Sequence, residues 1–490
     1  MTLSLALDIA RSRLATAADQ TAITSRNVAN AGNASTSRKI ANVVTLPAGG
    51  VALASVTRVA NASLLDGALR ATSLEATSKV VVEALEGLDQ ANAGPELDAS
   101  PAALVGKLRD ALQQFAAAPN EIVRAQMAVA TAVHVADGLN DATRAVQDLR
   151  AQADAEMAAS AEKIRSLLSQ LETINGKVTS GTRAGADVTD YLDQRDQVLN
   201  ELSEEIGIKT VARGDNDLLV LTDTGVIVFD TRPRPISFDP SPSLDATTQG
   251  NAFYIDGVPV AGSDGVMTVA SGRLAGLARV RDEIAPAYQN HLDEIARGLI
   301  EVFAESDQSA IPSLPDRPGL FTYSGAPAMP VSGTLFGGLA GLIRVADRVN
   351  PDVGGDPRLL RDGGISANPA FVYNPSGASA FSERLEEIAN KLDEPRGFDP
   401  AAGLEGSATV TGFATSSVAW LQEARKTENA EAEYRGTLRE RAVQALSRVS
   451  GVSLDEEMIN LLDLERAYQA TSKLISTIDE MLGSLLNAAA

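Results

Sequence analysis

The sequence contains no cysteine and very few aromatic or histidine residues. Among its 490 residues there are 2 His, and Phe, Trp and Tyr together make up 4%. The absence of Cys excludes disulfides and thiolate metal sites. Apolar residues still form 44% of the chain, mostly as Ala, Leu, Val and Ile. This mixture favours long, thin helical packing over a thick globular core.

Positive charge is also scarce, with 42 Lys and Arg against 64 Asp and Glu and a net charge of −22. Nucleic-acid binding requires a basic face, and an anionic membrane surface would repel this chain. We therefore expect no nucleic-acid partner and no membrane insertion. In the opening segment MTLSLALDIARSRLATAAD, Asp8 interrupts the apolar run and Arg11 and Arg13 follow it, unlike a cleaved signal peptide. We expect any export to proceed without one.

Both ends of the chain carry heptad repeats. Two apolar positions in every seven form the seam of a coiled coil. The first repeat ends at NVANAGNASTS, where Asn, Gly and Ser break a helix. The second follows Ser453 and Glu456, which fit a capping box. The N-terminal series are Leu7, Leu14, Thr21, Val28 and Leu3, Ala10, Ala17, Thr24; the C-terminal series are Leu454, Leu461, Tyr468, Ile475, Leu482 and Leu464, Thr471, Ile478, Leu485.

Between the ends, the period of the apolar residues changes several times. Residues 61–206 are mostly helical in pattern, and a β-meander follows around polar turns at 213–217 and 223–225. Helix returns at 273–305 and again from 414, with a Pro- and Gly-rich stretch between. The simplest architecture is nested: the chain ends pair with each other, and the insertions project at the opposite end.

The fold class predicted is mainly α with a β insertion. We expect an elongated, nested multidomain protein with paired terminal coiled-coil helices, a helical-bundle middle domain and an inserted outer β domain. The predicted boundaries are 1–45 and 452–490 for the terminal coiled-coil domain, 46–206, 272–310 and 380–451 for the helical rod, 207–271 for the β domain and 311–379 for a loop-rich region.

The C-terminal helix has a face with many large apolar residues, and no further segment of this sequence is placed after it to bury that face. Ordering each residue's backbone costs about 1–2 kcal/mol, and the N-terminal seam offers mostly Ala and Thr as a partner surface. One thin pair of helices is therefore marginal. We expect both ends to be disordered in the monomer and to become ordered when further copies pack around them.

Several residues suggest chemistry that the surrounding pattern does not support. Asp223-Thr224-Gly225 is the tripeptide of aspartic proteases, but it lies between two strand-like runs and suits a turn. The segment GDND at 214–217 lacks the Gly and Glu of a calcium loop. We predict a hairpin turn there and no enzymatic activity.

Other polar and aromatic residues also have ordinary structural explanations. Asp187, Asp190, Asp193 and Asp196 recur every three residues and could gather on one helix face. We expect Arg195 and solvent to offset their negative charge, rather than a bound metal cation. His134 and His291 are expected to be ordinary helix residues whose ring nitrogens have hydrogen-bond partners. Tyr468 and Trp420 are expected to fill packing seams between helices. No catalytic residue, metal or cofactor is predicted.

The ends of the chain resemble a known group of proteins. SLALDIARSRLATAADQTAITSRNVANAGNASTSRKI and GVSLDEEMINLLDLERAYQATSKLISTIDEMLGSLL resemble the two end signatures of bacterial flagellar axial proteins. In that group the first helix runs into Asn-Ile-Ala-Asn, which here is Asn27, Val28, Ala29 and Asn30. DYLDQRDQVLNELSEEIGI and SGRLAGLARVRDEIAPAYQNHLDEIARGLIEVFAE are similar to segments typical of the hook-associated protein 1 family.

One departure from the family pattern concerns the connector after the Asn tetrad. The family usually continues with Thr-Pro-Gly-Tyr-Ser-Arg, whereas this chain has AGNASTSRK and keeps only Ser37 and Arg38 of that pattern. The conformation of the connector is therefore left open.

The resemblance implies a structural role at the hook–filament junction of the bacterial flagellum, outside the cell. It also implies export without a cleaved signal by the flagellar type III apparatus. The implied partners are further copies in a tubular assembly, the hook protein, a second hook-associated (filament adaptor) protein and an export chaperone. The assembly interface is then expected at Leu7, Leu14, Asn27, Val28, Asn30, Leu454, Leu461, Leu464, Tyr468, Ile475, Ile478, Leu482 and Leu485.

Two alternatives remain from the residues. The chain could be another axial protein, such as hook protein or a flagellin-like adaptor, but the segment at 190–208 argues against both. It could instead be a secreted hydrolase built on the β region around Asp223.

Overall fold

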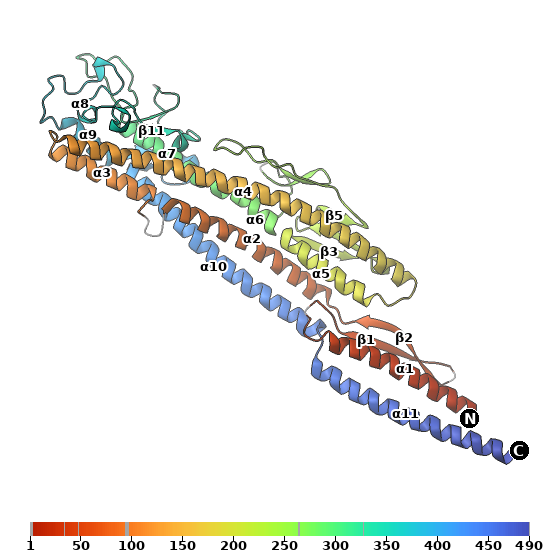
Figure 1. The fold of residues 1–490 in the computed structure, drawn as a ribbon. Helices are drawn as coiled ribbons and strands as arrows, with labels where there is room; N and C mark the ends of the chain where they lie inside the picture. The colour runs from red at the N-terminus through yellow and green to blue at the C-terminus, as the bar shows by residue number, and fades with distance from the viewer. Residues whose placement is uncertain are drawn as a thin grey trace.

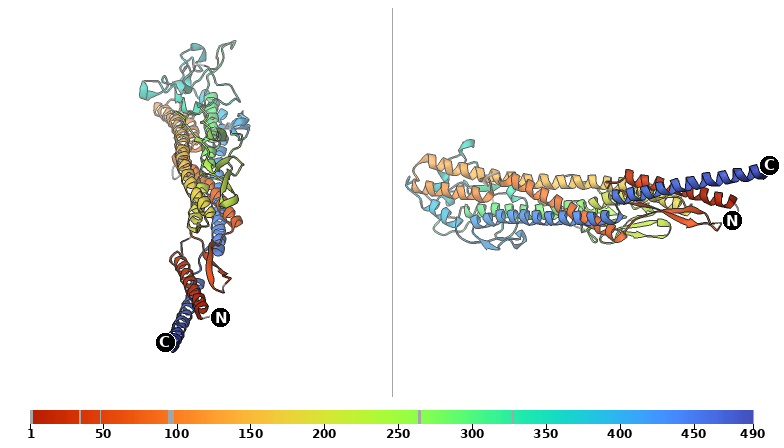
Figure 2. Two further views of the ribbon diagram at one scale, coloured as in Figure 1. Left: turned by 90° about the vertical axis from the view of Figure 1, so that its right-hand side faces the viewer. Right: turned by 90° about the horizontal axis from the view of Figure 1, so that it is seen from below.

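The computed structural model describes residues 3–33, 35–47, 49–93, 98–262, 265–326 and 328–489. The molecule is an elongated rod, and both chain ends lie together at one tip (Figures 1 and 2). Most described residues are helical, and the strands form small antiparallel sheets. This confirms the predicted fold class. None of the described helices has a window apolar and uncharged enough to cross a membrane.

Four long helices build most of the rod. They are α2 (Ala62–Ala93), α4 (Ile122–Arg183), α5 (Thr189–Glu205) and α10 (Val410–Ser450). The helix α3 (Pro101–Ala117) has the same length as α5, 17 residues. It starts with the Ser100 side chain accepting a hydrogen bond from the Ala103 amide, and Pro101 occupies the first helical position. At 62 residues, α4 extends for about 93 Å. The sequence has a seven-residue repeat at Met157, Ile164, Leu171 and Val178, with Ser160, Leu167 and Ile174 beside it. All of these are buried except Ile174, which is half-buried.

The rod core continues through α6 (Arg273–Arg279), a π-helical turn η2 (Val280–Ile284) and α7 (Ala285–Val302). Apolar residues surround α7 on nearly every side, and almost all of its residues are buried. Charges inside this helix are paired: Arg297 and Glu294 are both fully buried, with Nη2 and Oε2 2.7 Å apart. The helical middle therefore has a dense core of its own.

The β-meander predicted after residue 207 is present. Strands β3 (Ile208–Ala212), β4 (Leu218–Thr222), β5 (Ile227–Asp230) and β6 (Arg232–Pro233) form one antiparallel sheet. The turn between β3 and β4 places Asp215 and Asn216 at φ of 58° and 59°, where Asn and Asp are tolerated. The second sheet contains β7 (Ile236–Ser237), β8 (Phe253–Ile255) and β9 (Val258–Ala261).

The position of this β region differs from the expectation. It does not project at the end opposite the chain termini but lies along the flank of α4 (Figure 1). Arg183 pairs with Asp215 at 2.7 Å, Asn175 donates to Asp217 at 2.7 Å, and the Asp154 carboxylate accepts from the Ser241 amide at 2.7 Å. Periodicity reveals that an insertion exists, but the helix face that buries it is decided by long-range contacts.

The loop-rich region does lie at the end of the rod opposite the chain termini (Figure 1). Its regular structure is limited to short pieces, as the Pro and Gly content predicts. These pieces include β10 (Phe321–Tyr323), paired with β11 (Ile343–Val345), α8 (Leu359–Asp362) and short 3-10 turns. Beyond it the chain forms α9 (Glu383–Leu392) and the pair β12 (Arg396–Gly397) and β13 (Ser407–Ala408) before entering α10.

The terminal unit comprises α1 (Leu3–Ala29), the hairpin of β1 (Lys39–Thr45) and β2 (Val51–Arg58), and α11 (Leu454–Ala489). The two helices lie side by side in opposite directions, as the nested architecture predicts (Figures 1 and 2). The hairpin is fastened to α1, because Thr16 donates to the Val51 carbonyl at 3.0 Å and Ser12 accepts from the Val51 amide at 3.2 Å.

Candidate functional site

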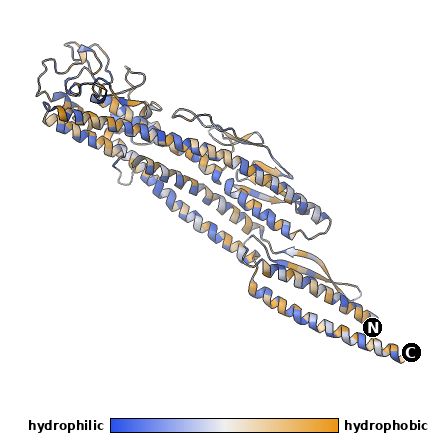
Figure 3. Ribbon diagram, viewed as in Figure 1, coloured by the Kyte–Doolittle hydropathy of each residue, from blue (hydrophilic) through white to orange (hydrophobic). Residues whose placement is uncertain are grey.

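The pairing of α1 with α11 covers only one strip of the apolar surface of α11. Ile478 is 7% exposed, whereas Leu485 is 55% exposed and Tyr468 46%. Figure 3 shows apolar residues recurring along both terminal helices. The half-buried members of the predicted series are Leu461, Leu464, Ile475 and Leu482. The exposed large side chains of α11 are Leu454, Met458, Ile459, Leu462, Tyr468, Leu474, Met481, Leu485 and Leu486.

On α1 the small members of the heptad series are the ones that become buried. Ala10 and Ala17 are 1% and 7% exposed, which allows close approach of a neighbouring backbone. The predicted interface residues Leu7, Leu14 and Val28 are only half-buried. Both helices therefore keep part of their apolar stripe accessible in the single chain.

The two Asn residues of the tetrad make contacts inside the chain. Asn27 is 2% exposed; its side-chain amide donates to the Lys39 carbonyl at 2.9 Å, and its side-chain oxygen accepts from the Lys39 amide at 3.0 Å. Asn30 donates to the Arg26 carbonyl at 2.9 Å. Asn27 thus joins the end of α1 to the start of β1, and in this chain it is closed to contact from outside.

Ser37 and Arg38, the residues retained from the family pattern, hold the connector in place. The Ser37 hydroxyl donates to Asp193 at 2.5 Å. The Arg38 guanidinium pairs with Glu456 at 2.9 Å and with Glu457 at 2.7 Å, and its amide donates to the Ser450 carbonyl at 2.8 Å. The connector therefore contacts both the last residue of α10 and the first turn of α11.

These contacts change the predicted cap of α11. Ser453 accepts only a long hydrogen bond of 3.5 Å from the Glu456 amide. The Glu456 carboxylate turns to Arg38 rather than back to the Ser453 amide. The capping box is thus incomplete, because an ion pair to the connector takes the carboxylate that the motif requires.

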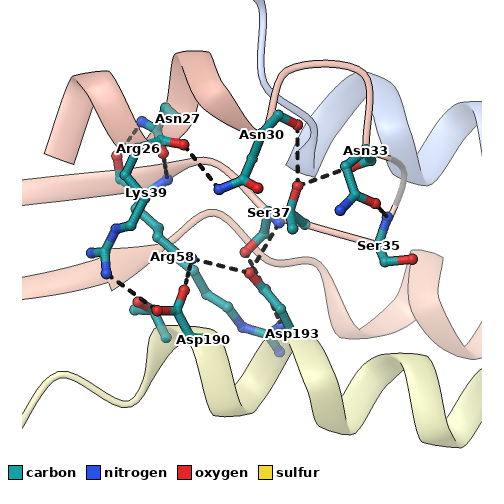
Figure 4. Close-up of polar contacts among 12 residues, drawn as sticks. Arg26, Asn27, Asn30, Asn33, Ser35, Ser37, Lys39, Arg58, Asp190 and Asp193 are labelled. Carbon is teal, nitrogen blue, oxygen red and sulfur yellow. Dashed lines mark hydrogen bonds and ion pairs between the residues drawn. The ribbon is translucent and has the colours of Figure 1, made fainter.

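Four aspartates around the start of α5 pair with three cations of the terminal unit (Figure 4). We call these seven residues the charge ladder: Asp187, Asp190, Asp193 and Asp196 with Arg26, Lys39 and Arg58. Each cation bridges two successive carboxylates. Arg26 lies 3.0 Å from Asp187 and 3.3 Å from Asp190. Lys39 pairs with Asp190 and lies 3.5 Å from Asp193. Arg58 lies 3.1 Å from Asp193 and 2.6 Å from Asp196.

Opposite charges and burial compete in the ladder, and the balance differs between residues: burial raises the pKa of Asp196 above its ordinary value in spite of Arg58 and Arg195. Burial by itself lowers the pKa of Arg58, but Asp196 and Asp193 outweigh it and raise the pKa above its ordinary value. Burial raises the pKa of Asp187, but hydrogen bonds from Thr189 and Arg26 outweigh it, so the net pKa is lowered.

Arg195 offsets the aspartates only in part, because its charge lowers the pKa of Asp196 but its guanidinium makes no ion pair with the row of aspartates. Its guanidinium donates to the Asn175 side-chain oxygen at 3.1 Å and to the Asn216 carbonyl at 2.6 Å, toward α4 and the β region. The cations that pair directly with the aspartates are Arg26, Lys39 and Arg58. The three-residue Asp repeat was a signal for one side of the ladder, but its partners are scattered through the sequence and carry no common pattern. Within the described ranges, no cluster of three or more His, Cys, Asp or Glu is arranged to hold a metal ion.

Two of the remaining candidate residues, Asp223 and His291, have structural contacts. The Asp223 carboxylate accepts hydrogen bonds from the Ser271 hydroxyl at 2.8 Å and the Ala270 amide at 3.2 Å, so it fastens the loop before α6. His291 is 1% exposed and packs edge-on against Trp420, with 4.9 Å between ring centroids. His134 is exposed on α4.

Comparisons with known proteins agree with this arrangement. Residues 96–313 match the family model of the flagellar hook-associated protein FlgK helical domain. Residues 443–488 match the model of the flagellar basal body rod FlgEFG protein C-terminal region. The first match covers the rod helices from α3 to α7, and the second covers the end of α10 and nearly all of α11.

Similar proteins extend the match along most of the chain. Flagellar hook-associated protein 1 of Bacillus subtilis is 23% identical over 414 residues, covering 77% of this chain and 74% of the relative. The Escherichia coli protein of that name is 22% identical over 402 residues, covering 70% and 72%.

A solved structure, that of the flagellar hook junction protein FlgK from Burkholderia pseudomallei, has the same fold. Its TM-score is 0.57 at 14% identity, and the alignment covers 80% of this chain and 100% of that one. With a rod that matches the FlgK helical domain and a C-terminal helix that matches the FlgEFG C-terminal region, the chain is similar to flagellar hook-associated protein 1 over most of its length.

Proposed function

We propose that this protein is a structural subunit of the bacterial flagellum that joins the hook to the filament and has no enzymatic activity. The observation that carries the proposal is the terminal unit, in which α11 keeps a long row of large apolar side chains exposed although it is paired with α1. Contiguous exposed apolar surface of this kind is typical of a protein interface. The extent of the FlgK helical-domain match favours this family over hook protein or a flagellin-like adaptor.

The interface proposed is the apolar surface of the terminal helices. Further copies of the chain pack against it in a tube and complete the burial that one α1 helix cannot provide. The hook protein lies on one side of this ring of subunits and a second hook-associated protein on the other. The residues proposed to bury there are Leu7, Leu14, Val28, Leu454, Leu461, Leu464, Tyr468, Ile475, Leu482 and Leu485, together with the exposed Leu474 and Met481 beside them and Asn30 at the edge. Ile478, also expected there, is already buried in the single chain.

The proposal includes the route to this position. The chain is exported by the flagellar type III apparatus without a cleaved signal peptide and functions outside the cell. An export chaperone shields the apolar face of α11 before secretion. The support for this step is the same exposed row of side chains, which would otherwise promote aggregation in the cytoplasm.

The test separates contacts between subunits from the pairing of α1 and α11. Leu474 and Met481 are 53% and 52% exposed, so Asp at both positions leaves the intrachain strip intact. We expect cells carrying L474D/M481D to form hooks without filaments in electron micrographs, because charges cannot be buried in the interface. The matched control is T477D/S484D, at exposed polar positions of the same helix, which should retain filaments. Normal filaments in L474D/M481D cells would refute the proposal.

A further inference from the structure

We infer that the charge ladder is an electrostatic joint, which holds the terminal unit on the rod about a buried pivot at Asp193 and lets it swing when the outer charge pairs are weakened. The inference concerns the single chain and does not depend on the proposed function. Its starting point is that polar contacts tie the terminal unit to the acidic row of α5, whereas the rod itself is held by an apolar core.

Asp193 is the centre of the ladder and its most buried carboxylate. It is 5% exposed and has three partners from the terminal unit. Ser37 donates through both its hydroxyl and its amide, at 2.5 Å and 3.3 Å. Lys39 and Arg58 lie 3.5 Å and 3.1 Å away. A carboxylate with this many donors keeps its contacts when the surrounding geometry changes, because one bond can lengthen while the others persist.

Exposure is lowest at this centre. Lys39 and Asp193 have side chains only 3% and 6% exposed. On one side of it, Asp190 is 54% exposed and Arg26 and Asp187 are each 33% exposed; on the other side, Arg58 and Asp196 are 12% and 25% exposed. Salt screens exposed pairs strongly and buried pairs weakly. Added salt therefore loosens the outer pairs first and leaves the centre in place, which is the behaviour of a pivot.

The backbone around the joint permits such a movement. The terminal unit is linked covalently to the rod through residues 59–61 and residues 451–453, none of which is helix or strand. The Arg38 amide and carbonyl hold these two links together, through Ser450 at 2.8 Å and Val59 at 2.8 Å. The links therefore converge beside Asp193, so the terminal unit can rotate there without breaking α1 or α11.

The spacing of the carboxylates allows the terminal unit more than one orientation on the rod. Successive aspartates are three residues apart, which is about 4.5 Å along a helix. Each cation already bridges two of them, so a small swing exchanges one partner for its neighbour without leaving a charge unpaired. In an assembly, identical chains could thereby keep their terminal helices packed while their rods meet different neighbours.

The absence of native cysteine allows a direct test by spin labelling. Spin labels are attached at A15C on α1 and S169C on α4, which are both exposed positions. Pulsed electron paramagnetic resonance then measures the distance between the two labels across the joint. We expect one narrow distribution at 0.01 M salt and a clearly broader one at 1 M salt, where the screening length falls from about 30 Å to about 3 Å. A S169C/T427C pair within the rod serves as the control and should not respond.

Variants distinguish the ladder from a general effect of salt. D190N removes the carboxylate shared by Arg26 and Lys39, and it should broaden the cross-joint distribution already at 0.01 M salt. D141N, which disrupts the exposed pair with Arg144 on α4, should leave the distribution unchanged. A distribution that is broad in the unmodified joint at low salt, or that responds to neither salt nor D190N, overturns the inference.

Discussion

The rod and the terminal unit are both built from long helices, but they bury their side chains differently. In the rod, α7 is surrounded on nearly every side, and even its charged residues Asp293, Glu294 and Arg297 are buried. In the terminal unit, Ile478 is the buried apolar residue of α11 among the described side chains, although α11 is twice as long as α7. A helix packed on one neighbour can cover only one strip of its surface. The comparison indicates that the rod is a complete fold, whereas the terminal unit is one component of a larger core.

The largest expected difference between the two regions is in local stability. If the terminal helices open with a free energy near zero and the rod only with its global free energy, proteolysis of the open forms should differ by about a thousand-fold or more. We expect limited proteolysis of the purified monomer to remove residues of α1 and α11 first and to leave a stable core from α2 to α10. Ends as resistant as the rod would contradict the expectation that they order on assembly.

The buried charges of the rod provide a second contrast. Arg297 is fully buried and contacts Glu294 at 2.7 Å, Glu301 at 2.5 Å and the Gly397 carbonyl at 2.7 Å. R297A leaves two carboxylates without their partner, and we expect it to lower the free energy of unfolding by about 3–5 kcal/mol. Denaturant unfolding followed by circular dichroism measures this effect.

The matched control for that prediction is R466A on α11. Arg466 and its partner Asp463 have side chains 80% and 70% exposed at 3.7 Å, so we expect a change below about 1 kcal/mol. Equal losses of unfolding free energy in R297A and R466A would show that charged residues are not more strongly buried and paired in the rod than in the terminal unit.

A smaller effect concerns pH. Burial lowers the pKa of His291 to about 4, with an opposing hydrogen bond to the Ala402 backbone. Because this pKa is below the ordinary value of about 6.5, the unfolded chain binds the proton more tightly than the rod. The contribution of His291 is therefore complete above pH 6.5 and is lost as the pH falls toward 4, by about 3 kcal/mol.

The H291Q variant isolates this contribution. The difference in unfolding free energy between H291Q and the unmodified chain should change between pH 7 and pH 4 in the direction that makes H291Q relatively more stable in acid. Burial raises the pKa of Asp293 to about 6 and acts in the opposite sense, but it is common to both chains and cancels. A difference that is independent of pH would contradict the assignment to His291.

Much of the fold could be predicted from the sequence, because long helices and meanders have a strong local signal. The seam from Met157 to Val178 and the break after Ala29 follow from the spacing of apolar and helix-breaking residues. The flank position of the β region could not be predicted, since strands carry no information about which helix buries them. The same limit explains the incomplete capping box at Ser453, where a connector residue 415 positions earlier competes for the carboxylate.

The candidate site divides in a similar way. The exposed apolar stripe of α11 was predictable, because a heptad series specifies one face of a helix whatever lies against it. The charge ladder was not, because Arg26, Lys39 and Arg58 approach α5 only after the terminal unit has folded beside the rod. Asn27 could not be recognised as an internal contact for the same reason.

The sequence by itself determined the mainly helical architecture, the nested order of its segments and the unsatisfied apolar face near its C-terminus. These properties depend on residues close together in the chain, whose period sets the secondary structure directly. The tertiary structure alone decided where the β region lies, which cations meet the aspartates and how the terminal unit is held on the rod. These properties depend on pairs of residues that lie at least 32 positions apart, and the local sequence pattern around one residue does not identify such a distant partner.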